Sequence, residues 1–227
     1  MADQFHMKLK GIYRRVPQRN TISSTKIRPL CMNHTKRRNK IIFNIITPCS
    51  RPNNLIHIYN SIINQKVPID SIKWWIVFDL VNPPFDVIKK FPSVNIESYA
   101  FEEHNFGNAQ RNFAIRRIQN GWVYFVDDDN IIHPDFLSSI MSITYFSGII
   151  VNQVHKNGTL RLKASSENTV PGVIDTAQFI IKKDIVDVEW MTSEYCADGF
   201  FINNIYCRNR EKFIFIDKPL SYYNFLR

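Results

Sequence analysis

Several features that are common in proteins are scarce or missing from this sequence. It has only seven glycines and no glycine-rich phosphate-binding loop. Its four cysteines, Cys31, Cys49, Cys196 and Cys207, form no CxxC pair and no zinc-binding spacing, so we expect reduced thiols. The six histidines form no HxxxH or similar pair, which argues against a zinc site.

Long apolar runs are also missing. No stretch approaches the roughly 18–20 consecutive apolar residues of a membrane-spanning helix. The first residues likewise lack the apolar core of a secretory signal. We therefore expect a cytoplasmic protein without a membrane span. Hydrophobic residues make up 44% of the chain and aromatic residues 13%, which is typical of a folded globular domain.

Positive charge is concentrated at one end of the chain. Residues 1–40 contain 11 Lys/Arg and one acidic residue, whereas residues 41–227 contain the other 18 Lys/Arg and 19 Asp/Glu. The total charge of +9 therefore describes the first segment alone. We predict a basic, flexible arm at 1–40 and a single domain at 41–227. The arm is either a solvated leader or a segment that binds nucleic acid, acidic lipid or an acidic protein surface.

The first half of the domain alternates between strand-like and helix-like segments. Runs of β-branched and aromatic residues predict strands, and apolar residues at a 3.6-residue period predict helices. This alternation is typical of an α/β fold with a mostly parallel central sheet flanked by helices. The expected strands are 41–46, 73–78, 94–101 and 122–126, and the expected helices are 52–63, 87–91 and 108–119.

The second half of the domain is less regular. An Asn157-Gly158 pair is typical of a tight hairpin turn. Residues 163–172 are polar and predict a loop. The remaining expected elements are helices at 134–143 and 198–207 and strands at 148–154, 173–181 and 213–216.

Polar side chains follow three of the predicted parallel strands. Thr47 follows the first strand, Asp79 the second and Asp127 the fourth. In open α/β sheets, ligands bind outside the carboxyl ends of the strands. These three positions therefore predict a ligand site at one edge of the sheet.

Asp127, Asp128 and Asp129 form an uninterrupted acidic run at the end of the fourth strand. Three neighbouring carboxylates repel one another and destabilise a fold unless a cation lies among them. A hard divalent ion with oxygen ligands, Mg²⁺ or Mn²⁺, suits such a run and can also neutralise a leaving diphosphate. The alternatives are a solvated acidic turn and a helix N-cap. The position at a strand end favours the metal site.

Three segments around this run resemble known glycosyltransferases. Residues 123–130, VYFVDDDN, are similar to the DxD segment of enzymes with the GT-A fold, and especially to that of the β-1,3-glucuronyltransferase family. Residues 46–52, ITPCSRP, resemble that family's nucleotide-binding turn, and residues 110–116, QRNFAIR, resemble one of its helices. The order and spacing also match, so the resemblance covers about residues 41–135.

The resemblance implies a metal-dependent transfer of a sugar from a UDP-sugar to a hydroxyl group of a glycan or glycoprotein. It places Asp79 near the base, Asp128 at the ribose and Asp129 on a Mn²⁺ or Mg²⁺ ion. A planar guanidinium suits phosphate and uracil oxygens, although a surface salt bridge would also account for Arg111. The nucleotide-sugar site implied by the resemblance comprises Thr47, Pro48, Arg51, Asp79, Arg111, Asp127 and Asp128.

The C-terminal half supplies candidates for the acceptor side. Residues 173–179, which include Asp175, resemble the family's acceptor-side strand. Residues 194–201 occupy the place where GT-A enzymes carry their catalytic carboxylate before a helix. Inverting transfer needs a base that takes the proton of the acceptor hydroxyl. We predict Asp198 as that base, with Glu194 in reserve. The alternative role for Asp198 is to cap the helix that follows.

Four tryptophans could stack on sugar rings. Trp74, Trp75 and Trp122 lie in or beside predicted strands, where packing in the core is the expected role. Trp190 lies near the predicted base and is the predicted acceptor platform.

The last segment departs from this family. Residues 213–223, FIFIDKPLSYY, are similar to family 2 glycosyltransferases instead. The glucuronyltransferases end near a histidine that touches the diphosphate, and no histidine follows His155. This departure does not support glucuronic acid as the donor. Small GT-A enzymes of large DNA viruses, which glycosylate capsid proteins, are comparable, and a viral protein would lie in the host cytoplasm or the virion.

The sequence thus predicts a single GT-A domain that transfers a hexose or related sugar with inversion. A catalytically silent module that binds nucleotides or glycans is one alternative, and it would bind UDP without hydrolysis or transfer. A nucleic-acid-binding protein led by the basic arm is another, and its affinity would fall steeply with salt. A nucleotidyltransferase is a third, but the phosphate loop that it needs is absent.

Overall fold

A computed structural model describes residues 40–227. The predicted basic arm falls outside the described residues, apart from Lys40. Within the described part, no helix combines the length and the apolar character needed to cross a bilayer.

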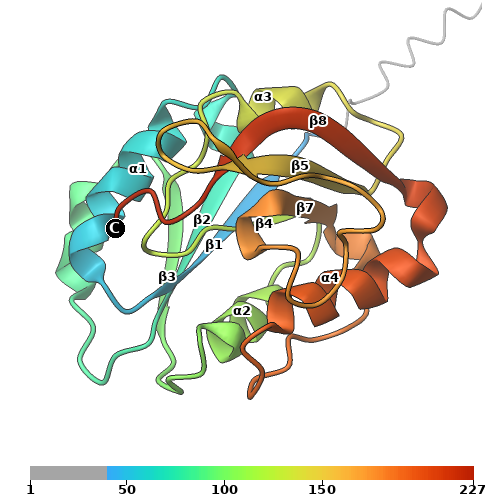
Figure 1. The fold of residues 1–227 in the computed structure, drawn as a ribbon. Helices are drawn as coiled ribbons and strands as arrows, with labels where there is room; N and C mark the ends of the chain where they lie inside the picture. Colours follow the sequence, from blue (N-terminus) through green and yellow to red (C-terminus); the bar gives the residue numbers. More distant parts are fainter. Residues whose placement is uncertain (1–39) are drawn as a thin grey trace, which may run out of the picture. The chain divides into compact units, whose positions relative to one another are not determined.

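Among the described residues, one mixed sheet of eight strands forms the centre of the fold (Figure 1). The strands are β1 Phe43–Cys49, β2 Ile72–Phe78, β3 Asn95–Ala100, β4 Trp122–Phe125, β5 Gly148–Val154, β6 Leu160–Leu162, β7 Phe179–Lys182 and β8 Phe213–Tyr222. Their order is β3-β2-β1-β4-β7-β5-β6, and β8 pairs with β5. The first four strands are parallel, as predicted, whereas β7 is antiparallel to both β4 and β5.

Within residues 40–227, four α-helices cover the two faces of the sheet (Figure 1). They are α1 Leu55–Ile63, α2 Asn108–Ile115, α3 Phe136–Met141 and α4 Ala197–Arg208. Helices α1 and α3 share one apolar core with the sheet, and α2 and α4 share the other. Central strands are therefore buried on both faces, with Trp74 in one core and Trp75 in the other. This is why β1, β2 and β4 are nearly continuous apolar runs.

Strand β1 continues three residues beyond its predicted end, through Thr47 and Pro48. Strand β1 pairs with β4 only as far as Ile46. The backbone nitrogen of Pro48 faces the β4 side, beyond the last pair, so its missing N–H removes no hydrogen bond of the sheet. The Thr47 side chain is 0% exposed, and its Oγ1 accepts a hydrogen bond from Trp74 Nε1 at 2.9 Å. Thr47 therefore lies in the core and does not reach the edge of the sheet.

Two elements of the second half also differ from the prediction. The strand expected at 173–181 is reduced to β7, because Asp175 begins a 3-10 turn at Thr176–Gln178 with a reciprocal capping box. Strand β8 instead runs past Pro219 to Tyr222. It pairs with β5 on one side, with a register shift beside Pro219, and such edge positions tolerate proline.

Candidate active site

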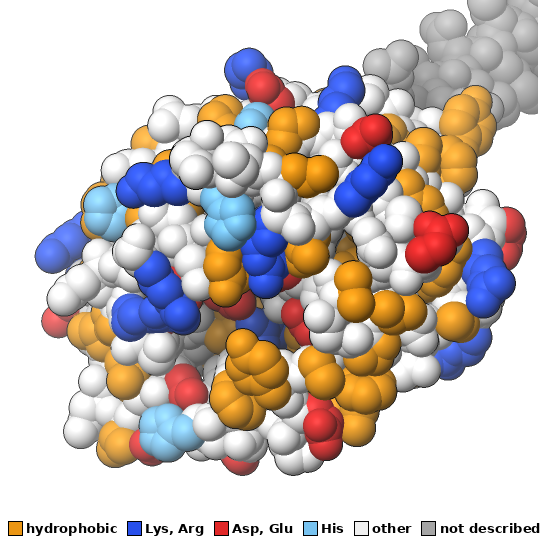
Figure 2. All heavy atoms as spheres, viewed as in Figure 1, with side chains coloured by type: hydrophobic (Ala, Val, Ile, Leu, Met, Phe, Trp, Pro, Cys, Tyr) orange, Lys and Arg blue, Asp and Glu red, His pale blue; other side chains and the backbone are white. Residues whose placement is uncertain are grey.

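A cleft of about 520 Å³ opens at the carboxyl ends of β1, β2 and β4. On the face shown in Figure 2, basic and acidic side chains gather around a hollow. The cleft brings together ten of the twelve predicted site residues, and leaves out Thr47 and Glu194. The ten are Pro48, Arg51, Asp79, Arg111, Asp127, Asp128, Asp129, Asp175, Trp190 and Asp198.

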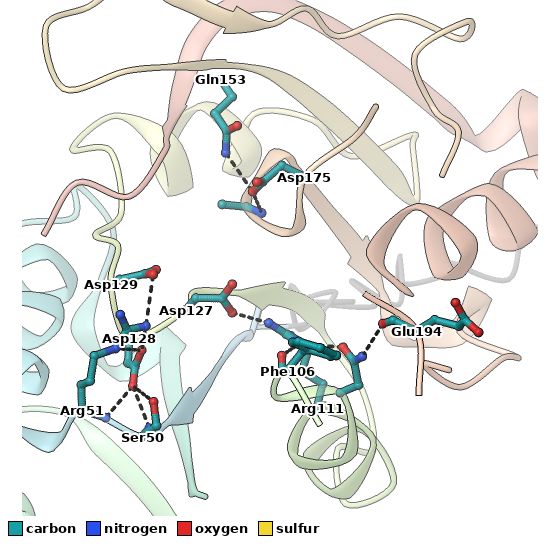
Figure 3. Close-up of polar contacts among 12 residues, drawn as sticks. Ser50, Arg51, Phe106, Arg111, Asp127, Asp128, Asp129, Gln153, Asp175 and Glu194 are labelled. Carbon is teal, nitrogen blue, oxygen red and sulfur yellow. Dashed lines mark hydrogen bonds and ion pairs between the residues drawn. The ribbon is translucent and has the colours of Figure 1, made fainter. Parts of the chain in front are cut away.

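Asp128 ties the end of β4 to the turn after β1 (Figure 3). Its Oδ2 accepts from the backbone N–H groups of Ser50 at 2.7 Å and Arg51 at 2.6 Å, and from the Ser50 hydroxyl at 3.0 Å. Its Oδ1 accepts from Nε and Nη2 of Arg51. A carboxylate offers about four acceptor sites, so these bonds saturate it. Asp128 therefore holds two loops together, and little capacity is left for the predicted contact with a ribose.

Asp127 and Asp129 line the cleft and also pair with arginines. Arg111 donates to Asp127, and Arg227 lies 2.5 Å from Asp129 Oδ2, with Arg51 at 3.1 Å from the same oxygen. Burial raises the pKa of Asp127, Arg111 opposes this shift, and Asp129 adds to it. The Asp127 side chain nevertheless keeps 39% exposure into the cleft. Each carboxylate of the acidic run thus has an arginine partner, which the sequence argument for a compensating cation did not include.

Helix α2 is bonded to the loop that precedes α4. Asn108 donates to the carbonyl oxygens of Met191 and Glu194, both at 3.1 Å. Asn112 donates to the Trp190 carbonyl at 2.9 Å and accepts from the Trp190 N–H at 2.8 Å. These four bonds hold the loop against α2, so the segment entering α4 has a fixed place relative to β4. The preceding residue, Gly107, occupies the N-cap position of α2.

Two glycines allow close packing at the N-terminal ends of α2 and α4. Gly107 has φ +79°, and a Cβ there would lie 2.7 Å from Pro48 Cβ. In α4, a Cβ on Gly199 would lie 2.3 Å from the Cα of Pro171. A side chain at either position would therefore displace a helix that carries site residues.

Trp190 lies beneath the cleft rather than on its surface. Its side chain is 2% exposed, with the Arg111 guanidinium 4.6 Å from the ring centroid and the Phe201 ring stacked at 4.7 Å. Little of the ring is free, so its position does not suit the predicted stacking on an acceptor sugar. The ring instead orients Arg111 toward Asp127.

Asp175 lines the cleft next to residues from β5 and β6. Gln153 donates to its Oδ1 at 2.8 Å (Figure 3). Arg161 lies 3.3 Å from its Oδ2. The Arg161 guanidinium also stacks 3.7 Å from the centroid of the Tyr223 ring. Asp175 and Arg161 therefore form a polar pair on this side of the cleft.

Asp198 differs from the other carboxylates of the cleft. Four of the six cleft aspartates pair with an arginine, and Asp79 lies 3.4 Å from His104 Nδ1. Within residues 40–227, Asp198 has no basic partner, and its Oδ1 accepts from the Gly199 N–H at 2.8 Å. Burial raises the pKa of Asp198 to about 6; the Gly199 amide opposes this shift and Asp175 adds to it. Among the cleft aspartates, Asp198 thus combines a raised pKa with the lack of a basic partner within the described residues.

The remaining predicted residues have simpler positions. Asp79 follows β2 as expected, and its Oδ1 accepts from the backbone N–H groups of Glu103 at 2.9 Å and His104 at 3.0 Å. Glu194 contributes its backbone carbonyl, while its carboxylate points away from Arg111 and the acidic run (Figure 3). This orientation does not favour Glu194 as a reserve base. Asp198 lies in the first turn of α4 and not at its N-cap.

Several cleft residues had no recognised signal in the sequence. Arg161 and Arg227 reach the cleft from β6 and from the segment after β8, far along the chain from the acidic run. Phe106 and Tyr195 lie at its rim, on loops. Ser50 could have been found from its place beside Arg51 in the turn after β1.

Asp198→Asn is expected to stabilise the protein above about pH 6. The folded-state pKa of about 6 lies above the ordinary value of 3.8, so the ionised carboxylate destabilises the fold. This destabilisation is absent below about pH 4, grows between about pH 4 and 6, and reaches its full size above about pH 6. The raised pKa corresponds to at most about 3 kcal/mol of stability. Thermal unfolding across this pH range should show that the variant is more stable than the unaltered protein. This difference in stability should rise up to about pH 6 and then stay level. A gain that does not change with pH would contradict the raised pKa.

The carboxylates of the cleft suit a hard divalent cation. Among the described residues, no group of three or more His, Cys, Asp or Glu side chains is placed to hold a metal ion. A cation of the Mg²⁺ type needs fewer protein ligands, because it binds one or two carboxylates and completes its shell with waters and substrate phosphates. Asp127 and Asp129 offer that number, so the residues present fit such an ion.

Comparison with known proteins finds no matching family model and no match among curated proteins, but solved structures do match. S. aureus TarS has a TM-score of 0.68 at 17% identity, over 80% of this chain and 36% of that chain. TarS 1–349 in complex with UDP-GlcNAc has a TM-score of 0.66 at 17% identity, over 81% of this chain and 58% of that chain. The mannosyltransferase PcManGT from Pyrobaculum calidifontis, in complex with GDP-Man and Mn²⁺, has a TM-score of 0.62 at 13% identity. The match covers 79% of this chain and 55% of that chain.

These similarities establish the fold. The protein is a mixed α/β structure with a GT-A-like fold, which confirms the fold predicted from the sequence. The chain spans between 36% and 60% of the length of the matched TarS chains.

Proposed function

We propose that this protein is a metal-dependent glycosyltransferase, which transfers a sugar from a UDP-sugar to a hydroxyl group of a glycan or glycoprotein with inversion. The observation that carries the proposal is Asp198, a carboxylate of raised pKa without a basic partner, in the same cleft as the acidic run. A base and a site for a leaving diphosphate are the two parts that such a transfer needs. Similar folds solved with UDP-GlcNAc and with GDP-Man support a nucleotide-sugar donor.

The donor would bind along the ends of β1, β2 and β4. Pro48 and Arg51 would contact the nucleotide, with Asp79 near its base. Guanidinium groups match the paired oxygens of phosphates, so Arg51 and Arg111 would bind the diphosphate or the donor sugar. A Mn²⁺ or Mg²⁺ ion, held by Asp129 with Asp127 beside it, supplies positive charge to the leaving diphosphate when bound.

The acceptor would bind on the side of Asp198 and Asp175. Asp198 takes the proton of the acceptor hydroxyl while that oxygen attacks the anomeric carbon of the sugar. A base with a pKa of about 6 is mostly ionised near pH 7 and is more basic than an ordinary aspartate. Attack from the face opposite the diphosphate inverts the anomeric carbon in one step, so a single base is sufficient.

A panel of UDP- and GDP-sugars, each with Mn²⁺ or Mg²⁺, tests this function. We expect a UDP-sugar to raise the melting temperature and to be hydrolysed slowly, both in a cation-dependent manner. NMR of the transfer product decides the anomeric configuration, and retention would contradict the one-base mechanism. Binding of UDP without hydrolysis or transfer would instead identify a catalytically silent nucleotide- or glycan-binding module.

Asp129→Ala is expected to remove the effect of Mn²⁺ on UDP binding. In the unaltered protein, we expect Mn²⁺ to increase UDP affinity at least about tenfold, or about 1.4 kcal/mol. The variant loses the carboxylate but frees Arg227, so UDP alone should bind at least as tightly. Calorimetry of UDP with and without Mn²⁺ measures both effects. Asp70→Ala, which removes an exposed carboxylate paired with Lys40, is the control. Undiminished enhancement by Mn²⁺ in Asp129→Ala would exclude Asp129 as a ligand.

A further inference from the structure

Two aromatic side chains stand exposed at the rim of the cleft. Phe106 is 61% exposed and Tyr195 is 84% exposed. Their ring centroids lie 5.5 Å apart with an interplanar angle of 85°, an edge-to-face contact. Single exposed aromatics are common on protein surfaces, but these two contact each other and line the same cleft. They come from separate loops, one before α2 and one before α4.

The loop that carries Phe106 is held in an unfavourable backbone conformation. Both His104 and Phe106 have φ +52°, and the next residue is a glycine at φ +79°. The left-handed region costs a bulky residue about 1–2 kcal/mol. The loop is fixed from both sides, by the two backbone bonds to Asp79 and by Arg111, which donates to the Phe106 carbonyl at 2.9 Å. Backbone strain maintained in this way is characteristic of functional sites, and here its result is an exposed ring.

We propose that Phe106 and Tyr195 form an acceptor subsite that binds the apolar face of a pyranose ring. This inference rests on the proposed function, and it names the acceptor as a carbohydrate. Tyr195 is three residues before Asp198, so their Cα atoms are at most about 11 Å apart. A sugar stacked on the pair therefore brings its own hydroxyl groups, or those of the next ring, to the base.

The surroundings of the pair favour a sugar over an apolar peptide side chain. An apolar side chain binds best in an enclosed apolar pocket, whereas these rings are open and the cleft beside them is lined by charged groups. A pyranose has an apolar C–H face and a rim of hydroxyl groups. The two rings, nearly perpendicular to each other, can contact the C–H face of the sugar. Asp198, Asp175 and Arg161 can form hydrogen bonds with its hydroxyl groups. Aromatic side chains with this amphipathic environment suit such mixed ligands.

The test uses methyl glycosides of the common pyranoses and their disaccharides as probes, titrated with and without UDP and Mn²⁺. Saturation-transfer NMR should show magnetisation reaching the ring C–H protons of at least one probe. Tyr195→Ala should weaken that binding at least about fivefold, since one aromatic contact contributes about 1 kcal/mol. Tyr195→Phe should retain it. Tyr145→Ala, which removes a tyrosine that is 94% exposed and lies outside the cleft, should have no effect.

A second variant separates ligand binding from folding. Phe106→Gly removes the ring and also relieves the backbone at φ +52°, so it should keep the melting temperature while weakening the same probes at least about fivefold. Affinity for UDP should remain unchanged in both variants. If no probe receives saturation, or if Tyr195→Ala binds as tightly as Tyr145→Ala, the aromatic subsite is refuted. Absence of UDP binding in the unaltered protein would refute the donor site instead, and the titrations without UDP keep the two outcomes distinct.

Discussion

Asp198→Asn is expected to lower the rate of sugar transfer by about 10²–10⁴-fold, the usual contribution of a general base. The amide has nearly the same shape and can still accept the Gly199 N–H, but it cannot take a proton. UDP affinity with Mn²⁺ should stay unchanged, because Asp198 is not among the proposed donor contacts. The measurement is kcat for transfer together with calorimetry of UDP. The expected gain in stability, once measured, would exclude misfolding as the cause of any loss.

The pH dependence of the same reaction provides an independent check. Transfer by the unaltered protein should rise as Asp198 loses its proton and level off above about pH 6, or at lower pH if a bound cation favours the ionised form. The residual activity of Asp198→Asn should lack that rise. Glu194→Gln is the control, because the Glu194 carboxylate points away from the cleft (Figure 3). If Asp198→Asn keeps its turnover while Glu194→Gln loses it, the base is Glu194.

The parallel half of the sheet could be predicted because its signals are local. Each strand from β1 to β4 is an apolar run of a few residues, bounded by its own breakers. The expected strands 41–46 and 213–216 stop short of Pro48 and Pro219, whereas β1 and β8 run through these residues. A proline ends a strand only where its N–H is needed. Whether it is needed depends on which neighbour pairs at that position, and for β1 and β8 that neighbour is distant in sequence.

The candidate site was predictable where the sheet alone determines position. Residues after parallel strands meet at one edge, which brought Asp79, the acidic run and Arg51 together. The partners of the carboxylates were not predictable in this way. Arg227 belongs to the last segment of the sequence, and nothing near it in the chain indicates that it pairs with Asp129. The roles of Trp190 and Glu194 were equally hidden, because they depend on which way a loop held by α2 turns its side chains.

Asp128→Asn should lower the stability of the fold by about 3 kcal/mol, at the lower end of the range for a broken buried ion pair because Arg51 is 42% exposed. An asparagine keeps one acceptor oxygen, so either the backbone N–H groups of Ser50 and Arg51 or the Arg51 guanidinium lose their partner. For a chain of this length, the melting temperature should fall by roughly 6–12 °C. Differential scanning calorimetry of the ligand-free protein measures this directly. Asp135→Asn, which removes an exposed ion pair with Lys66, should change it little.

This experiment also decides between two roles for the middle residue of the acidic run. The family resemblance places Asp128 at the ribose, which predicts weaker UDP binding by a variant that folds normally. The acceptor sites of Asp128 are all filled by the protein itself, which predicts a large loss of stability in the absence of any ligand. An unchanged melting temperature combined with reduced UDP affinity would contradict the structural role. The three carboxylates then differ in what surrounds them. Asp128 accepts five hydrogen bonds at the turn after β1, whereas Asp127 and Asp129 pair with arginines and line the cleft.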